Sequence, residues 1–332
     1  MTAVVIAVPV RNEAESLPAL LEALARQQGA PPFTIHCLFD GCADDGAAIA
    51  QRQAAHFALS LKVARSQNTG PPNAGLARGR ACALALNDRP EAALLTTDAD
   101  STPDPRWLAA SLTALRVADV AAGRIEAVGD VPPLQRRLAV YLDRLHRQRR
   151  ALDPVDWEDA RTHHWTSAAS LAFAPGVYAA IGGFAPLTCG EDGDLVDRAW
   201  RAGHRVRRDA RIAVSTSARR QGRVPGGFAS LLAALDRSAA LPLVAHPADE
   251  IWRYRHHALA RRSFRQGDLT AFARAVRLDA AEAARIAANS PNGDAFAARA
   301  VGVPPSGMRQ VSLAAAERKL GALAVTELAG AA

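Results

Sequence analysis

Apolar runs alternate with helical patterns along the N-terminal part of the chain, to about residue 125. Four runs of apolar and β-branched residues, each followed by a polar or glycine-containing turn, predict strands: Val4–Val10, Thr34–Phe39, Leu59–Ala64 and Ala92–Thr97. Between them, apolar residues recur with the spacing of one helix face over Ser16–Arg26, Ala47–His56 and Gly75–Leu86. This alternation predicts an α/β fold with a doubly wound parallel sheet.

Helical patterns dominate the rest of the chain. Periodic apolar positions over Ile251–Phe264 and Leu269–Ala288 predict a C-terminal helical appendage after about residue 245. Another helix is expected from Glu191 to about Arg201. The segment Leu134–Arg150 is amphipathic, with arginines between its apolar positions. Packing against a sheet is the favoured interpretation of this segment, and binding to anionic lipid headgroups is the alternative.

The composition indicates a protein with a sizeable core and no membrane span. Hydrophobic residues make up 49% of the 332 positions, but no apolar run approaches the length that crosses a bilayer. The first strand starts at once, without a basic leader, and the four cysteines show no Cys-x-x-Cys spacing. We expect a cytoplasmic protein, with peripheral attachment to the inner membrane face as the alternative.

The formal net charge of +7 is carried almost wholly by arginine, because Lys62 and Lys319 are the only lysines. A genome rich in G and C explains the high total of arginine together with alanine, so the position of the arginines matters more than their number. The arginine excess gathers in the second half of the chain, where an anionic substrate or a membrane surface could use it. We expect no nucleic-acid partner.

Polar side chains follow three of the predicted strands, at the point where each strand ends. Arg11, Asn12 and Glu13 follow the first strand, Asp40 the second, and Asp98 and Asp100 the fourth. Ligands of doubly wound sheets bind beyond the carboxyl ends of the strands, so we expect these groups at one crevice. Two carboxylates spaced one residue apart suit Mg²⁺ or Mn²⁺, although a helix-capping turn would also explain Asp100-Ser101-Thr102-Pro103.

A dinucleotide-binding Rossmann domain is excluded by the end of the first strand. Such a domain needs Gly-x-Gly-x-x-Gly there, so that the backbone can approach a pyrophosphate, whereas this chain has Pro9-Val10-Arg11-Asn12-Glu13. No Walker lysine loop occurs either. Pro9 instead stiffens the exit of the strand, and the side chains after it are able to hydrogen-bond a base and a ribose.

Taken together, these motifs resemble the family 2 glycosyltransferases of the GT-A fold over about 225 residues. The segments that carry the resemblance are VPVRNEAESLPALLEAL, LFDGCADDGA, NTGPPNAGLARGRACALAL, TTDAD, and IGGF followed by GEDGDL. The resemblance implies a GT-A fold, a doubly wound, mixed but mostly parallel sheet with helices on both faces. This domain would cover residues 1–245, with a nucleotide-binding half at 1–125 and an acceptor half at 126–245. Residues 246–332 would form the helical appendage, which serves acceptor selection or self-association, with a homodimer as one outcome.

The resemblance also implies roles for individual residues. An inverting transferase moves a sugar from a nucleotide diphosphate-sugar to an acceptor hydroxyl of a small molecule, a glycan or a lipid headgroup. The residues expected to contact the nucleotide, by similarity, are Pro9, Arg11, Asn12, Glu13, Asp40, Arg78, Asp98, Arg219 and Arg223. Asp98 and Asp100 would hold Mg²⁺ or Mn²⁺, Asp192 would be the catalytic base, and Glu191 would orient its neighbours. Asp194 is expected only to complement the helix terminus.

Two positions depart from the family pattern. Phe39 stands where many members have a second acid before Asp40, which leaves one carboxylate for the base. Gly79 follows Arg78 where members often have Asn, and Pro71-Pro72-Asn73 lengthens the approach to this helix. Arg78 is therefore either a phosphate contact or a solvated helix arginine.

Two other functions share part of this pattern. A sugar-phosphate nucleotidyltransferase uses a related sheet and a metal, but it should carry a glycine-rich, arginine-containing loop after the first strand, which this chain lacks. A catalytically silent binding protein is the other alternative, and the acids at 98, 100 and 192 argue against it. His163-His164-Trp165 is either an acceptor platform or a packed tryptophan beside two bystander histidines.

Overall fold

The computed structural model describes residues 3–67, 70–237 and 242–329, and of 324–329 it describes the helix alone. Asn68 and Thr69, which open one of the family-like segments, lie outside the described residues. The chain divides into two compact units. Unit 1 comprises 1–131, 159–199 and 205–233, and unit 2 comprises 132–158, 200–204 and 234–332. The functional boundaries expected near residues 125 and 245 stay predictions.

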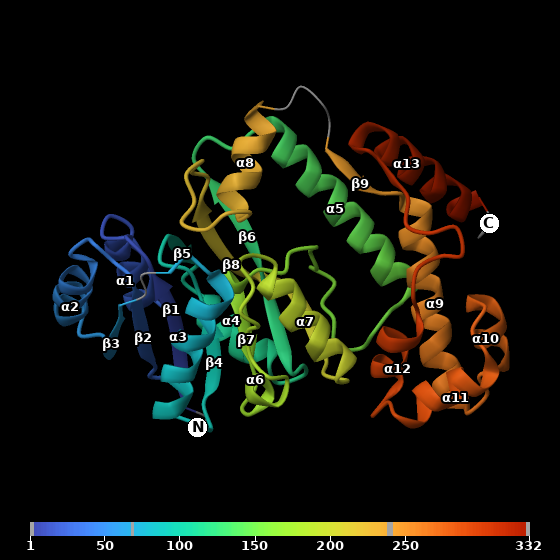
Figure 1. The fold of residues 1–332 in the computed structure, drawn as a ribbon, viewed down its shortest axis with the longest axis horizontal. Helices are drawn as coiled ribbons and strands as arrows, with labels where there is room; N and C mark the ends of the chain where they lie inside the picture. The colour runs from blue at the N-terminus through green and yellow to red at the C-terminus, as the bar shows by residue number, and fades with distance from the viewer. Residues whose placement is uncertain (1–2, 68–69, 238–241, 330–332) are drawn as a thin grey trace. The chain divides into compact units, whose positions relative to one another are not determined.

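Within the described residues, eight strands of unit 1 form one sheet in the order β3-β2-β1-β4-β7-β6-β8-β5 (Figure 1). Their bounds are β1 Val4–Val10, β2 Thr34–Asp40, β3 Leu61–Ser66, β4 Ala93–Thr96, β5 Ser101–Pro103, β6 Val120–Val128, β7 Leu171–Phe173 and β8 Val206–Ser217. β1 pairs in parallel with β2 and β4, β2 with β3, and β6 with β8, whereas β5 and β7 pair antiparallel to their neighbours. The predicted mixed, mostly parallel sheet is confirmed.

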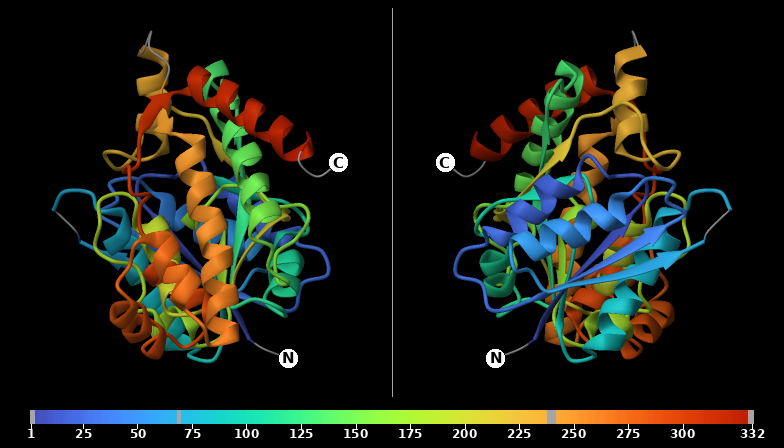
Figure 2. Two further views of the ribbon diagram at one scale, coloured as in Figure 1. Left: turned by 90° about the vertical axis from the view of Figure 1, so that its right-hand side faces the viewer. Right: turned by 90° about the vertical axis from the view of Figure 1, so that its left-hand side faces the viewer.

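Helices cover both faces of this sheet because side chains of β1 alternate between two cores. Val4, Ile6 and Val8 belong to one core, together with side chains of α1 (Leu17–Ala25), α2 (Gly46–His56) and α4 (Trp107–Ala114). Val5 and Ala7 belong to the other, with α3 (Ala74–Asp88), α6 (Val177–Ala180) and α7 (Glu191–Arg201). Figure 2 shows α1 and α2 in blue on one side of the strands. The 3₁₀ turn Ala168–Ser170 precedes β7, and α8 (Phe228–Arg237) follows β8.

Unit 2 is built from helices around a two-stranded ribbon. Its elements are α5 Pro133–Leu152, β9 Leu243–Ala245, α9 Pro247–Gln266, α10 Thr270–Val276, α11 Ala280–Ala288, α12 Gly293–Ala300, β10 Gln310–Ser312 and α13 Leu313–Ala329. Tyr141 and Leu145 of α5 are buried with Ile251 and Tyr254 of α9 and Leu313 of α13. The apolar face of α5 therefore packs on helices and on the β9–β10 ribbon, since Val244 and Val311 belong to the same cluster. The favoured interpretation, that this segment covers a sheet, holds in part, for this two-stranded ribbon.

The predicted helical appendage is confirmed, but its second helix is interrupted. The periodic segment Leu269–Ala288 forms α10 and α11, because Arg277 adopts a left-handed conformation with φ 56°. Asp279 then caps α11 by accepting a hydrogen bond of 2.8 Å from the backbone N–H of Ala281. Among the described residues, no helix is both long enough and apolar enough to cross a bilayer.

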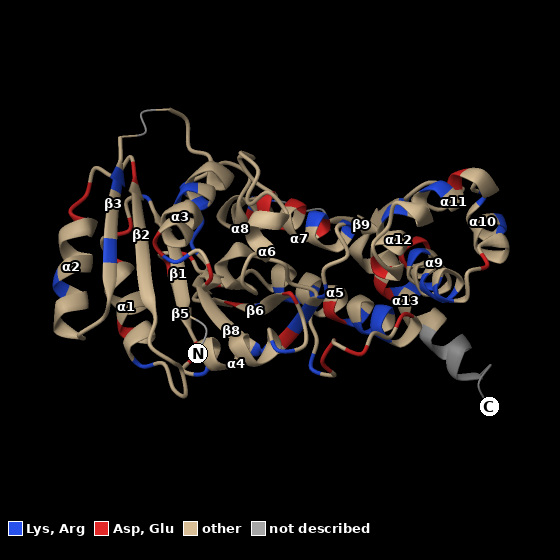
Figure 3. Cartoon of the chain, turned by 90° about the horizontal axis from the view of Figure 1, so that it is seen from below, with Lys and Arg blue, Asp and Glu red and all other residues tan. Residues whose placement is uncertain are grey.

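The two units differ in charge. Unit 1 contains twenty Lys and Arg residues and twenty Asp and Glu residues. Unit 2 contains twenty Lys and Arg residues but thirteen Asp and Glu residues, so it carries the whole formal net charge of +7 (charged residues in Figure 3). Seven of the fourteen arginines from 201 to 265 nevertheless belong to unit 1, where acids elsewhere in that unit balance them, so the arginine excess predicted for the second half of the chain is shared by both units.

Candidate functional site

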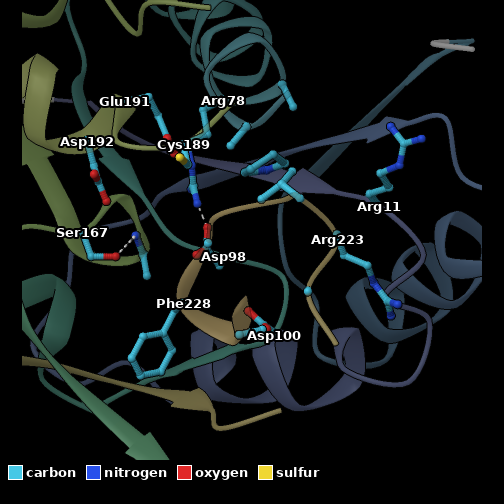
Figure 4. Close-up of a pocket in the computed structure, with 18 of the residues that line it drawn as sticks. Arg11, Arg78, Asp98, Asp100, Ser167, Cys189, Glu191, Asp192, Arg223 and Phe228 are labelled. Carbon is cyan, nitrogen blue, oxygen red and sulfur yellow. Dashed lines mark hydrogen bonds and ion pairs between the residues drawn. The ribbon is translucent and has the colours of Figure 1, made fainter. Parts of the chain in front are cut away.

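A cavity of about 400 Å³ opens in unit 1 beyond the carboxyl ends of β1, β2 and β4. It has the size of a small-molecule site. All of the predicted site residues except Asn12 line it: Pro9, Arg11, Glu13, Asp40, Arg78, Asp98, Asp100, Glu191, Asp192, Arg219 and Arg223 (ten of the lining side chains are labelled in Figure 4). The residues after β1, β2 and β4 therefore meet at one cavity, as expected for a parallel sheet. The segment that contains Arg219 and Arg223 lines the same cavity.

Each carboxylate of the Asp98 and Asp100 pair meets a different arginine. Asp98 is bonded by Arg78 of α3, and an oxygen of Asp100 lies 3.0 Å from Nη2 of Arg219, which follows β8. Burial, and then the charge of nearby Asp98, raises the pKa of Asp100 to about 6, although Arg219 acts in the opposite direction. The two acids thus stand side by side at the cavity wall, each with a cationic neighbour.

Arg78 connects Asp98 with Glu191, which precedes the expected catalytic base Asp192. Its Nε donates to Oε1 of Glu191 over 2.8 Å, while its Nη1 donates to Asp98 (Figure 4). Burial raises the pKa of Glu191, and the Arg78 charge opposes that rise. Helix α3 holds Arg78 in place because Asn73 caps it, accepting from the Leu76 N–H over 2.8 Å. Arg78 is therefore paired and largely buried, so its interpretation as a solvated helix arginine is wrong. Its contact with phosphate stays a prediction.

Glu13 anchors the arginine-rich segment after β8. It is 5% exposed, and both of its oxygens accept from Arg219, at 2.8 and 2.5 Å. Arg223 donates to the same carboxylate over 3.0 Å, and to the backbone oxygen of Asn12 over 2.5 Å. Asn12 has a left-handed backbone, φ 51°, and its side chain accepts from the Ala43 N–H. Asn12 thus shapes the turn after β1, and the predicted nucleotide contacts of Asn12 and Glu13 stay predictions.

Asp192 sits in the first turn of α7 and lines the cavity. One of its oxygens accepts from its neighbour Gly193 N–H over 2.7 Å, and the other from the Ala168 N–H over 3.4 Å. Asp194, by contrast, pairs with Arg198 one helical turn on, at 2.8 Å. This arrangement agrees with the interpretation of Asp194 as a helix-terminus acid and leaves Asp192 beside the cavity.

The far end of β2 contributes Asp40 to the cavity. This carboxylate is 2% exposed, and Nη1 of Arg80 lies 3.5 Å from its Oδ1. A buried carboxylate at a strand end is able to accept hydrogen bonds from a ligand that displaces water there. The single acid expected from the sequence at this position therefore lines the cavity, and its contact with a base stays a prediction.

An aromatic wall closes another side of the cavity. Trp165 meets Phe228 edge to face, with ring centroids 6.0 Å apart, and both residues line the cavity. His163 turns inward instead: it is 1% exposed, a ring nitrogen lies 3.2 Å from the Ala122 oxygen, and the other accepts from the Trp165 N–H. Sequence reasoning missed Phe228, because a lone aromatic after Gly226-Gly227 carries no pattern. Of the histidine-tryptophan segment, Trp165 is the residue placed for contact with a ligand.

The donor set of the acid pair fits a hard divalent cation. Asp98 and Asp100 offer carboxylate oxygens, the ligands that Mg²⁺ and Mn²⁺ prefer. Among the residues that the structure describes, no cluster of three or more His, Cys, Asp and Glu side chains could hold a metal. Such a pair suits a cation that completes its shell with phosphate oxygens and water rather than with further side chains.

Comparisons with known proteins agree with this geometry. The sequence model of glycosyl transferase family 2 matches residues 5–171, about half of the chain. No curated protein matches the chain. The structure is similar to S. aureus TarS 1–349 in complex with UDP-GlcNAc, with 18% identity, 91% of this chain and 90% of that chain covered and a TM-score of 0.50. It is also similar to the mannosyltransferase PcManGT from Pyrobaculum calidifontis in complex with GDP-Man and Mn²⁺, with 16% identity, 88% and 77% covered and a TM-score of 0.50.

The match to the family model spans β1 to β7 and includes the acid pair at the end of β4. The two solved structures share the fold of this chain at low identity. The chain is therefore an enzyme of the GT-A type and belongs to glycosyltransferase family 2.

Proposed function

We propose that this enzyme transfers a sugar from a nucleotide diphosphate-sugar to an acceptor hydroxyl with inversion at the anomeric carbon. The observation that carries the proposal is that the Asp98 and Asp100 pair and Asp192 line the same cavity. Transfer needs both groups, because a diphosphate must leave while a hydroxyl attacks from the opposite face of the sugar. The ligands named for TarS and PcManGT, UDP-GlcNAc and GDP-Man, are donors of the proposed class.

Asp40 and Arg11 would receive the base and ribose at the end of the cavity near β1 and β2. Arg219 and Arg223 would turn toward the diphosphate, because guanidinium forks match phosphate oxygens. Asp98 and Asp100 would hold Mg²⁺ or Mn²⁺. When bound, such a cation neutralises charge on the departing diphosphate. PcManGT, whose structure contains Mn²⁺ with its donor, supports this part of the proposal.

On the acceptor side, Asp192 would take the proton of the attacking hydroxyl. Glu191 is held by Arg78 and would fix the position of its neighbour Asp192 at the start of α7. Trp165 and Phe228 would pack against the apolar face of an acceptor sugar, because aromatic rings offer broad apolar surface beside polar groups. Proton transfer to a positioned carboxylate accelerates such a step by about 10²- to 10⁴-fold.

A thermal-shift titration tests the proposal. We expect UDP or GDP to raise the unfolding temperature, and Mn²⁺ to enlarge that rise relative to EDTA, because binding to the folded state stabilises it. Asp100→Asn should remove the Mn²⁺-dependent part, while Asp45→Asn, an exposed acid before α2, should keep it. A protein that no nucleoside diphosphate stabilises, with or without Mn²⁺, would contradict the proposed donor class.

The same material then tests for chemistry. Incubation with UDP-GlcNAc, GDP-Man and other diphosphate-sugars should release nucleoside diphosphate slowly even without an acceptor. A catalytically silent binding protein would shift in temperature but release nothing. A nucleotidyltransferase would instead form pyrophosphate from a nucleoside triphosphate and a sugar phosphate, so the released product separates the three alternatives.

A further inference from the structure

One face of α5 carries a row of arginines around an exposed valine. Arg136, Arg137, Val140, Arg144 and Arg147 are all exposed, and Val140 is 59% exposed. At about 100° per residue these five positions fall within an arc of roughly 100° on the helix, and they extend over about 16 Å along it. We call these five residues the α5 basic stripe.

The opposite face of α5 is fixed by packing, so the stripe cannot turn inward. Tyr141 and Leu145 are buried in the apolar cluster of unit 2 with Ile251 and Leu313. Arg149, which is not part of the stripe, packs over Trp200, with its guanidinium 5.2 Å from the centre of the ring. The arginines of the stripe therefore differ from the structural arginines of the same helix.

The surroundings of the stripe are basic as well. Arg137 pairs with Glu317 of α13 at 2.5 Å, and the next residues of α13, Arg318 and Lys319, are exposed. Two acids accompany the stripe: Asp143 of α5, which is half-buried, and Glu317 of α13, which pairs with Arg137. Unit 2 carries the whole net charge of +7, while unit 1 is balanced. An anionic partner is therefore complementary to this face.

We propose that the α5 basic stripe binds the surface of a membrane that contains anionic phospholipids. Four arginines on one amphipathic helix form the kind of cluster that anionic headgroups attract. Val140 favours lipid over nucleic acid as the partner. An exposed apolar side chain between arginines is stabilised when it enters the boundary between headgroups and acyl chains, whereas a phosphate backbone offers it no apolar contact. The proposal does not depend on the proposed sugar transfer.

Sedimentation with vesicles tests this surface. The full-length protein should bind vesicles of phosphatidylcholine with a third phosphatidylglycerol, and it should stay in solution with phosphatidylcholine alone. High salt should release it, because the Debye length falls to about 3 Å at 1 M. The double variant Arg144→Gln with Arg147→Gln should bind roughly ten- to thirty-fold more weakly, since each arginine near such a surface contributes about 1 kcal/mol.

A matched control separates the stripe from overall charge. Arg262→Gln with Arg274→Gln removes the same two charges from exposed positions of α9 and α10, and its vesicle binding should stay within about two-fold of the wild type. All four positions are solvent-facing, and equal urea midpoints would confirm that each variant folds. Asp192→Asn should bind vesicles like the wild type even if transfer is lost.

Three results would overturn the proposal. The first is no sedimentation with either kind of vesicle. The second is an equal loss of binding in the stripe variant and the control, which would assign binding to net charge alone. The third is retention of a short RNA or DNA duplex by the wild type without vesicle binding, which would identify a nucleic acid as the partner.

Discussion

At the residue scale, the carboxylates of the site differ in the groups that hydrogen-bond or pair with them. Asp98, Asp100 and Glu191 each meet an arginine, whereas the oxygens of Asp192 accept from backbone N–H groups. Hydrogen bonds from arginine are charge-assisted and fix the carboxylates that accept them. The different partners of Asp192 support its proposed role in proton removal.

We expect Asp192→Asn to lower sugar transfer by about 10²- to 10⁴-fold, because the amide keeps the shape but loses the basicity. Donor affinity should change little. Asp194→Asn is the matched control, since its partner is Arg198, and it should transfer at nearly the wild-type rate. Single-turnover transfer with donor titration measures both quantities. A wild-type rate in Asp192→Asn, or a product that keeps the anomeric configuration of the donor, would refute an inverting base at 192.

Arg78, which pairs with both Asp98 and Glu191, should also contribute to the stability of the protein. Arg78→Met leaves Asp98 and Glu191 without their shared partner, and we expect the free energy of unfolding to fall by about 3 kcal/mol. Arg80→Met, also in α3, removes a half-exposed arginine that lies 3.5 Å from Asp40, and should change stability by less than about 1 kcal/mol. Urea unfolding measures both, and equal losses would mean that the Arg78 pairs contribute no more than a surface bridge.

The positions of some of these residues could be predicted from the sequence, but the partners of others could not. Strand ends are readable because an apolar run stops at a polar residue, so Asp40, Asp98 and Asp100 could be placed at one crevice in advance. The partners of Arg78 were not readable. They lie 20 and 113 residues away along the chain, and pairing over such separations depends on the packing of α3 against the loop before α7.

At the element scale, α3 approaches the loop before α7 closely enough to require a glycine. A Cβ placed on Gly75 would lie 1.9 Å from the backbone oxygen of Ala185, whereas one on Gly79 would lie 3.5 Å from the oxygen of Phe184. The first contact is impossible without moving backbone, and the second is ordinary. The loop from Ala185 therefore rests directly on the first turn of the helix that presents Arg78.

We expect Gly75→Ala to destabilise the protein by roughly 1–3 kcal/mol, because the added methyl group pushes the loop from the helix. Gly79→Ala should be neutral or stabilising by up to about 1 kcal/mol, since alanine has the higher helix propensity. Thermal and urea unfolding provide the comparison. A stabilised Gly75→Ala variant would show that this loop yields without loss.

Element boundaries followed the sequence where local signals were strong. β1 is the predicted Val4–Val10, and α7 is the predicted helix to Arg201. The prediction failed over Leu269–Ala288, because the periodic pattern continues through a break that Arg277 and Asp279 create. It was incomplete for the partner of α5, which is made of helices as well as a sheet, because periodicity identifies the apolar face of a helix but not the surface that covers it.

At the scale of the whole molecule, stability should depend on pH through a buried histidine of unit 2. His257 is 2% exposed and meets Trp200 edge to face at 4.8 Å. Burial, followed by the charges of Arg149, Arg253, Arg261 and Arg150, holds its pKa well below the ordinary value of 6.5. The folded protein therefore keeps His257 neutral at a pH where the unfolded chain binds a proton.

As pH falls below about 6.5, the free energy of unfolding should decrease by up to about 1.4 kcal/mol per pH unit from this residue, until the folded pKa is reached. His257→Phe should be less sensitive to acid between pH 7.5 and 5.5. His256→Phe, the same change at the half-buried neighbour, should keep the wild-type slope. Urea unfolding at several pH values measures the slopes, and an unchanged slope in His257→Phe would contradict the assignment.

Unit 2 is assembled from separate stretches of chain, so the predicted boundary at 245 can be tested by truncation. A fragment of residues 1–245 would retain α5 but lose Ile251, Tyr254 and Leu313, which cover Tyr141 and Leu145. We expect the fragment to bind a hydrophobic dye and to aggregate, whereas the full chain does neither. A monomeric fragment that unfolds cooperatively would show that residues 1–245 suffice for a stable fold.

The discontinuity of unit 2 also has a consequence during synthesis of the protein. Helix α5 ends at Leu152, but its cover in α13 begins at Leu313. A ribosome that adds roughly 5–20 residues per second needs about 8–30 s for the stretch between them. For all or part of that interval Tyr141 and Leu145 lack some of their apolar cover, beside a row of arginines. We therefore expect translation of this protein to rely on a chaperone that shields α5 until the C-terminal helices emerge.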